Sequence, residues 1–132
     1  MRSQECLNAL RCRMTFLIAE DNVRMRESIK RFLDRNVPDH HIFLEASDGG
    51  EAVSMYNQHS PDWVLMDIEM EPMDGLAALK SIRASSFTAK VIIVTSYDDA
   101  AYRKAAKEEG ACGYVLKTHL DELGAILTSK KY

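Results

Sequence analysis

The sequence lacks the features that would place the chain in a membrane or on a nucleic acid. None of its apolar stretches approaches the roughly 20 residues of a membrane-spanning helix, and the N-terminus has no apolar signal-peptide core. No block of basic residues occurs, and the formal net charge is -3 at pH 7, which argues against a general affinity for nucleic acids or anionic membranes. We therefore expect a cytoplasmic protein that binds neither directly.

Cysteine is scarce. The three residues, Cys6, Cys12 and Cys112, match no metal-binding spacing, and we interpret them as reduced thiols. A redox role for Cys6 and Cys12 is the alternative, ranked below that of ordinary small side chains. Repeats and low-complexity tracts are also absent, so a chain of 132 residues indicates one domain that is large enough to bury a core without disulfides.

From residue 15 onward, short apolar runs alternate with stretches of helical period, which is typical of βαβ units around a parallel sheet. Runs such as Val91-Ile92-Ile93-Val94 lack the alternation of a half-exposed strand and are expected to be buried on both faces. The sequence therefore predicts an α/β fold. Its predicted strands are residues 15–19, 41–45, 63–66, 90–94 and 113–116, and its predicted helices are about 23–37, 50–58, 75–84, 98–109 and 120–129.

Two terminal features complete the organisation. Residues 1–14 precede the first predicted strand and form either a short helix or a flexible extension; we expect flexibility, and assign 15–132 to the domain. The chain ends shortly after the fifth predicted helix begins, so we expect no output domain within it. The alanine-rich helix at 98–109 is expected to hold its position least firmly, because small side chains bury little area.

Acidic residues follow two of the predicted strands, at the point where each strand ends. Glu20 and Asp21 come directly after the first strand, and Asp67 follows the third. If these strands are neighbours, three carboxylates converge at one edge of the sheet. Crowded carboxylates raise one another's pKa unless a cation compensates them, and Mg²⁺ prefers such oxygen ligands. Capping of a helix or a position in a solvated turn would explain any single acid, but three acidic residues at two matching strand ends favour a magnesium site.

The other strand ends supply complementary groups. Thr95 and Ser96 follow the fourth strand and offer hydroxyls, and Lys117 follows the fifth strand and offers a cation. Each alone would be an ordinary strand end or surface lysine. Their common position beside the acids predicts a site for a phosphoryl group.

This pattern resembles the receiver domain of bacterial two-component response regulators, over residues 15 to about 130. The resemblance implies a flavodoxin-like, doubly wound sheet of five parallel strands in the order 2-1-3-4-5, flanked by five helices. It is carried by Glu20-Asp21, Asp67 in "LMDIEM", "MDG" at 73–75, Thr95-Ser96 in "VTS" and Lys117 in "GYVLK".

The resemblance implies that Asp67 takes a phosphoryl group from a phosphohistidine of a sensor histidine kinase. Asp21, Asp67 and the backbone carbonyl of Glu69 would hold Mg²⁺, with Mn²⁺ as an alternative ion and with Glu20 acting chiefly through water. Lys117 and the ion would neutralise charge on the phosphoryl oxygens. Such a protein catalyses its own phosphorylation and dephosphorylation, but it is a signalling protein rather than a metabolic enzyme.

A switch is implied as well. Thr95 would move toward the phosphoryl group and Tyr114 would turn inward, which couples the site to a face formed by the fourth helix, fifth strand and fifth helix; a homodimer through this face is a further expectation. Glu69 and Tyr97 would flank the phosphoryl group and tune its lifetime. The stretch 110–127 resembles receivers that precede DNA-binding domains, which suggests a role in transcription regulation.

Two departures from the family pattern stand beside the site. Glu71 occupies the place where a proline is common, with Pro72 after it, so the path and charge of this loop are expected to differ. Thr118 replaces the proline that usually follows the lysine. We expect a trans bond there, because a cis bond before a residue other than proline costs about 3 kcal/mol.

Three alternatives share parts of this pattern. A flavin carrier of the same fold needs a phosphate loop rich in glycine and hydroxyls after its first strand, where this chain has Glu20 and Asp21. A phosphatase with an aspartyl intermediate would carry its nucleophile after the first strand, not the third. The serious rival is a pseudo-receiver that is not phosphorylated and acts only as an interaction module. We rank it lower because all the reactive residue types are present.

Overall fold

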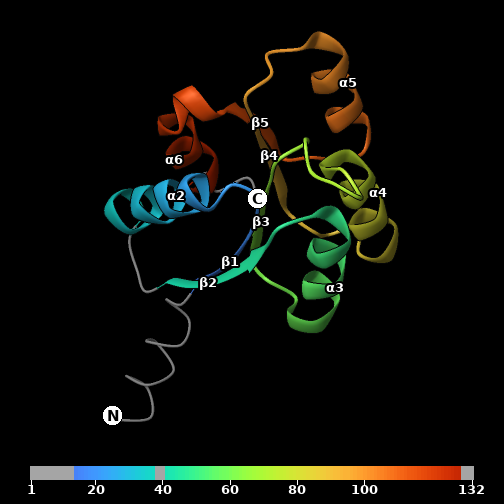
Figure 1. Ribbon diagram of the computed structural model, residues 1–132, viewed down its shortest axis with the longest axis horizontal. Coiled ribbons are helices and arrows are strands. Elements are labelled where there is room, and N and C mark those ends of the chain that lie inside the picture. The colour runs from blue at the N-terminus through green and yellow to red at the C-terminus, as the bar shows by residue number, and fades with distance from the viewer. Residues whose placement is uncertain (1–13, 38–40, 129–132) are drawn as a thin grey trace.

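The computed structural model, which describes residues 14–37 and 41–128, is built on one sheet of five parallel strands (Figure 1). The strand order is β2-β1-β3-β4-β5, which confirms the predicted doubly wound α/β fold. The order reverses between β1 and β3, and loops that diverge there leave a crevice at the carboxyl edge of the sheet. The strands are β1 (Met14–Ala19), β2 (His41–Ala46), β3 (Trp63–Met66), β4 (Val91–Thr95) and β5 (Gly113–Leu116).

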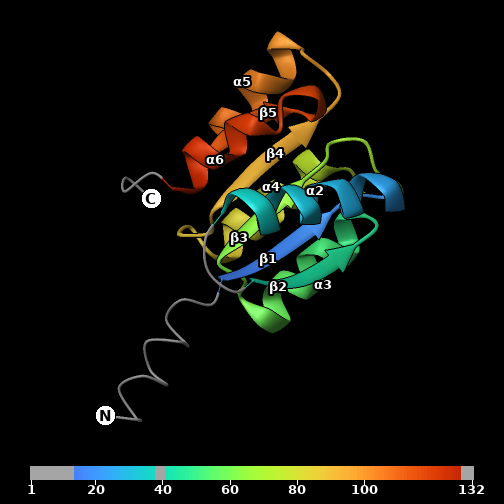
Figure 2. The same cartoon turned by 90° about the vertical axis from the view of Figure 1, so that its left-hand side faces the viewer.

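Helices cover both faces of this sheet. Helices α2 and α6 lie on one face, and α3, α4 and α5 lie on the other (Figures 1 and 2). None of the helices in residues 14–37 and 41–128 is both long enough and apolar enough to cross a bilayer. The helices are α2 (Val23–Asn36), α3 (Gly49–His59), α4 (Gly75–Ser85), α5 (Ala100–Glu108) and α6 (Asp121–Leu127), with a 3₁₀ turn η1 (Lys117–His119) before α6.

Each strand sends alternate side chains into two separate cores. In β1, Phe16 and Ile18 belong to the core under α2 and α6, whereas Leu17 and Ala19 belong to the core under α3, α4 and α5. All four side chains are buried. Burial on both faces leaves no polar face on residues 16–19 of β1 or on β3, which explains why these two runs are continuously apolar. Glu20 and Asp67 are therefore the first polar groups after these runs.

The element boundaries match the prediction within two residues, and α5 and α6 differ most. The helix predicted at 98–109 is α5, and the helix predicted at 120–129 is α6, which begins at Asp121, directly after the 3₁₀ turn and Leu120, and ends at Leu127. Residues 1–13, 38–40 and 129–132 lie outside the described part. The predicted thiols at Cys6 and Cys12 and almost all of the predicted flexible extension, residues 1–14, fall there. The exception is Met14, the last residue of that extension, which begins β1.

Candidate functional site

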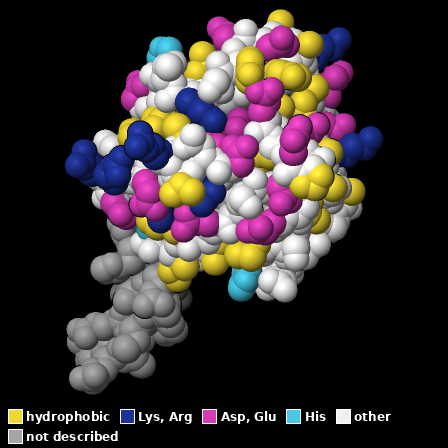
Figure 3. Space-filling view, viewed as in Figure 1, with side chains coloured by type: hydrophobic (Ala, Val, Ile, Leu, Met, Phe, Trp, Pro, Cys, Tyr) yellow, Lys and Arg dark blue, Asp and Glu magenta, His cyan; other side chains and the backbone are white. Residues whose placement is uncertain are grey.

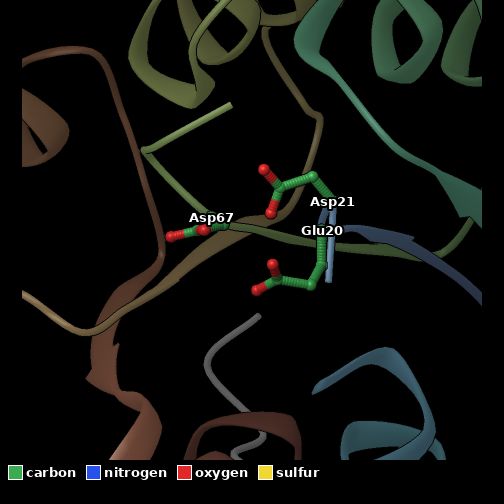
Figure 4. Close-up of side chains that lie close together, drawn as sticks. All are labelled: Glu20, Asp21 and Asp67. Atoms are coloured by element: carbon green, nitrogen blue, oxygen red, sulfur yellow. The ribbon is translucent and has the colours of Figure 1, made fainter. Parts of the chain in front are cut away.

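Three carboxylates meet at the carboxyl edge of the sheet. Glu20 and Asp21 follow β1, and Asp67 follows β3, which pairs with β1 in the register Ala19 to Met66. One carboxylate oxygen from each acid lies within 4.8 Å of the others. Figure 4 shows the three side chains gathered in one place from these two strand ends. The convergence that the sequence predicted is therefore present.

Burial makes this cluster electrostatically demanding. Glu20 is only 2% exposed and Asp67 only 5% exposed, whereas Asp21 is exposed. Burial raises the pKa of both Glu20 and Asp67, because it penalises a charged carboxylate. The cation of Lys117 compensates in part, since its Nζ lies 2.6 Å from Glu20 Oε1 and 3.1 Å from Asp67 Oδ2. Burial acts to lower the pKa of Lys117, but its bonds to the two acids outweigh this effect and raise it.

The oxygen atoms of the cluster fit a hard divalent cation. Asp67 Oδ1 accepts the N–H of Ile68 at 2.8 Å, and Glu20 Oε2 accepts the N–H of Asn22 at 3.0 Å. Glu20 Oε1 is buried and receives no well-aligned hydrogen bond, although Lys117 Nζ is close. Three carboxylate oxygens that lie this close together form a set of ligands that suits Mg²⁺ or Mn²⁺.

A cleft of about 460 Å³ adjoins the cluster. Its wall includes four acids, Asp21, Glu69, Glu71 and Asp74, together with apolar side chains such as Tyr102. Figure 3 shows many acidic side chains across the middle of the face toward the viewer, with the largest group of basic side chains at its left and others at its right edge. Glu71, the departure from the family pattern, is exposed and lines this cleft, so it adds negative charge beside the site.

Thr95 and Tyr114 are both tied to the main chain of Tyr97. Thr95 is fully buried at the end of β4, and its Oγ1 accepts the N–H of Tyr97 at 3.3 Å. The hydroxyl of Tyr114 donates to the carbonyl of Tyr97 at 2.5 Å, while the Arg103 guanidinium lies over the Tyr114 ring, 4.5 Å from its centroid. Sequence reasoning missed this link, because a main-chain acceptor leaves no trace in residue type.

The side chain of Tyr97 bridges two loops beside Asp67. The carboxylate of Glu69 acts on its phenol and raises the pKa of Tyr97. Its ring meets Tyr102 of α5 edge-on, with the centroids 6.3 Å apart. The two residues that the sequence predicted to tune the phosphoryl lifetime therefore interact with each other.

The remaining predicted features concern the backbone. Gly75 begins α4 where the helix touches the loop after β3. Its N–H donates to the carbonyl of Ile68 at 2.8 Å, and a Cβ here would lie 1.8 Å from the carbonyl oxygen of Asp67. Only glycine permits this approach. In the described ranges, the cis peptide bond is the one between Glu71 and Pro72, so the bond after Lys117 is trans, as expected.

Comparisons with known proteins agree with this geometry. The family model for the response regulator receiver domain matches residues 16–128. The transcriptional regulatory protein LiaR of Bacillus subtilis (strain 168) is 40% identical over 104 residues, which cover 77% of this chain and 48% of LiaR. The chain thus spans about half the length of that relative.

Two CheY proteins extend the comparison. The chemotaxis protein CheY of the same bacterium is 37% identical over 101 residues, covering 76% of this chain and 82% of CheY. A solved CheX-CheY complex with BeF3 and Mg from Borrelia burgdorferi has a TM-score of 0.81 at 25% identity and covers 90% of each chain.

Proposed function

This chain belongs to the family of response regulator receiver domains, and we propose that it is a phosphoacceptor switch whose phosphorylated residue is Asp67. The phosphoryl group would come from a phosphohistidine of a sensor histidine kinase, in a reaction that depends on Mg²⁺. The observation that carries this proposal is the position of Asp67, which is buried beside two further acids and 3.1 Å from the ammonium of Lys117.

The transfer needs little covalent chemistry from the protein. A carboxylate oxygen of Asp67 attacks the donor phosphorus, the phosphorus–nitrogen bond breaks, and the electron pair leaves with the imidazole nitrogen, which takes up a proton. Asp67 must be deprotonated to attack. Lys117 and the N–H of Ile68, 2.8 Å from Asp67 Oδ1, both stabilise the deprotonated form.

The other residues of the site would bind and orient. Glu20, Asp21, Asp67 and the backbone carbonyl of Glu69 would hold Mg²⁺, or Mn²⁺ in its place. When bound, the ion supplies positive charge that neutralises the phosphoryl oxygens. Lys117 supplies a second positive charge, and the hydroxyl of Thr95 a hydrogen bond.

The switch would act through the link between Thr95, Tyr97 and Tyr114. A Thr95 hydroxyl that turns toward a phosphoryl oxygen changes its contact with the N–H of Tyr97, and the carbonyl of the same residue holds Tyr114. We infer that phosphorylation thereby alters the surface formed by α5, β5 and α6, through which a homodimer would form. In a longer protein similar to LiaR, this surface would regulate transcription.

Acetyl phosphate and Mg²⁺ give a direct test. Incubation of the chain with both should add the mass of one phosphoryl group, and Asp67→Asn should abolish the gain. Asp62→Asn is the matched control, because Asp62 lies at the opposite end of β3, where its carboxylate accepts the N–H of Thr15 at 2.7 Å. A wild-type chain that gains no mass with any donor or metal would instead favour the pseudo-receiver.

A further inference from the structure

Arg26, near the start of α2, connects the acidic cluster to the edge strand β2. Its Nη1 donates to the main-chain carbonyl of Glu20 at 2.5 Å, and its Nε donates to Glu45 Oε1 at 3.0 Å. The side chain is only 16% exposed, so both contacts are shielded in part from water. Among the described residues, no salt bridge joins Arg26 to a carboxylate of the cluster. Its contact with the site is to the backbone.

The carbonyl that Arg26 binds belongs to the peptide group between Glu20 and Asp21. The last paired residue of β1 is Ala19, opposite Ala46, and the N–H of Glu20 still donates to the carbonyl of Ala46 at 2.9 Å. Beyond this point the chain leaves the sheet. Because this peptide group joins two members of the cluster, its orientation sets the direction in which both side chains leave the backbone.

Arginine suits this position because its planar fork can donate to two acceptors at once. One acceptor is the carbonyl of Glu20, and the other is the carboxylate of Glu45. Lys30 also contacts this carboxylate, with its Nζ 3.3 Å from Glu45 Oε2. Glu45 neutralises the guanidinium. The arginine can therefore fix the backbone without presenting an uncompensated cation that would compete with a divalent ion for the carboxylates.

We propose that Arg26 is a positioning residue for the divalent-ion site, an inference that rests on the proposed function. It holds the Glu20–Asp21 peptide group so that the carboxylates of the cluster are preorganised before an ion arrives. Outer contacts of this kind typically change metal affinity by about 10- to 100-fold. Arg26→Gln should therefore weaken the binding of Mg²⁺ by roughly ten-fold or more, although no proposed metal ligand is altered.

The test measures ion binding directly. Binding of Mg²⁺ by calorimetry and of Mn²⁺ by electron paramagnetic resonance would be compared for the whole chain and its variants. Arg26→Lys keeps the charge but cannot reach both acceptors with one fork, so it should also lose affinity. Lys30→Gln is the matched control, because it removes the other ion pair to Glu45 and leaves the carbonyl contact intact; it should bind as the wild type does.

Two further readouts separate positioning from loss of fold and from failure of the site. Circular dichroism checks that each variant folds, and the Arg26→Lys variant carries the test if Arg26→Gln does not. The amide resonance of Asp21 should shift in the metal-free Arg26 variants. Wild-type affinity in folded Arg26→Gln or Arg26→Lys, with binding lost in Asp21→Asn, would overturn this inference alone. A wild-type chain that binds neither ion would overturn both this inference and the proposed site.

Discussion

Opposing electrostatic demands meet in single residues of the site. Asp67 must be charged to act as a nucleophile, yet its burial raises its pKa. Glu20 is subject to the same effect and lies in the same cluster. Lys117 relieves part of the repulsion, but one ammonium faces two buried carboxylates. A cation bound at this cluster would therefore stabilise both the fold and the deprotonated form of Asp67.

This balance predicts a pH dependence of stability. The folded-state pKa values of Glu20 and Asp67 lie above the ordinary values of 4.5 and 3.8 for these side chains. Between each ordinary pKa and the raised one, the metal-free folded chain therefore binds more protons than the unfolded chain. The stability of the metal-free chain should therefore fall as pH rises from the ordinary pKa values of these two acids through the raised ones. Mg²⁺ binds the deprotonated acids, so the stabilisation that it adds should grow over the same range, to roughly 2.7 kcal/mol at a 100-fold excess over its Kd.

Thermal unfolding with Mg²⁺ and with a chelator, from pH 4 to 7.5, would measure this dependence. Asp67→Asn is the informative variant, because it removes one buried charge while leaving an oxygen to accept the N–H of Ile68. It should stabilise the metal-free chain near neutral pH by about 1 kcal/mol and should reduce the effect of Mg²⁺. An effect of Mg²⁺ that is the same at every pH would contradict the prediction.

A second residue-scale prediction concerns Tyr97 and Glu69. The carboxylate of Glu69 raises the pKa of the Tyr97 phenol across the two loops beside Asp67, and we expect this pair to restrict the approach of water to a phosphorylated Asp67. Tyr97→Ala should shorten the phosphoryl lifetime several-fold, and Tyr97→Phe, which keeps the ring against Tyr102, should have a smaller effect. Release of inorganic phosphate after removal of the donor is the measurement. If Tyr97→Ala and wild type lose phosphate at the same rate, the bridge does not tune the lifetime.

Among the secondary-structure elements, α4 is the one whose position depends most directly on a missing side chain. A Cβ at Gly75 would lie 1.8 Å from the carbonyl oxygen of Asp67, whereas a Cβ at Gly124 in α6 would meet nothing within 4 Å. Gly75→Ala must therefore move α4 or the loop that carries Asp67. Gly124→Ala relieves only the entropic cost of a glycine inside a helix.

These two glycines form a matched pair for a stability measurement. Gly75→Ala should destabilise the chain by about 1–3 kcal/mol and should also impair phosphorylation of Asp67. Gly124→Ala should stabilise it by roughly 0.5–1 kcal/mol and leave phosphorylation unchanged. Denaturant unfolding of both variants would measure the change in the free energy of unfolding. Equal changes for the two substitutions would show that the contact between Gly75 and Asp67 does not constrain α4.

The helix boundaries show what the sequence could and could not predict at this scale. Asp98 and Asp99 are both good capping residues, and the sequence alone does not choose between them. In the structure Asp99 caps α5 by accepting the N–H of Tyr102, while Asp98 pairs with Arg103 at 3.0 Å. The choice depends on a tertiary partner for Asp98. The predicted start at residue 98 was therefore too early.

For the whole molecule, the sequence could predict the site because a parallel sheet converts chain order into position. Once the strands and their order were inferred, residues at strand ends had to meet at one edge. Two contacts that were missed involve main-chain acceptors, which are the carbonyl of Tyr97 that holds Tyr114 and the carbonyl of Glu20 that holds Arg26. Every residue has a carbonyl, so residue type does not indicate which one is used.

Coupling across the molecule predicts different outcomes for phosphorylation and for the response to it. In Lys117→Ala the three acids remain, so phosphorylation by acetyl phosphate should continue, although more slowly. The conformational response should be lost, because Lys117 directly follows β5 and joins that strand to Asp67 and Glu20.

Amide resonances of α5 and β5, recorded before and after phosphorylation, are the measurement. Lys80→Ala, an exposed position on α4, is the control and should respond as the wild type does. A phosphorylated Lys117→Ala chain with the wild-type spectral change would show that the coupling does not pass through Lys117.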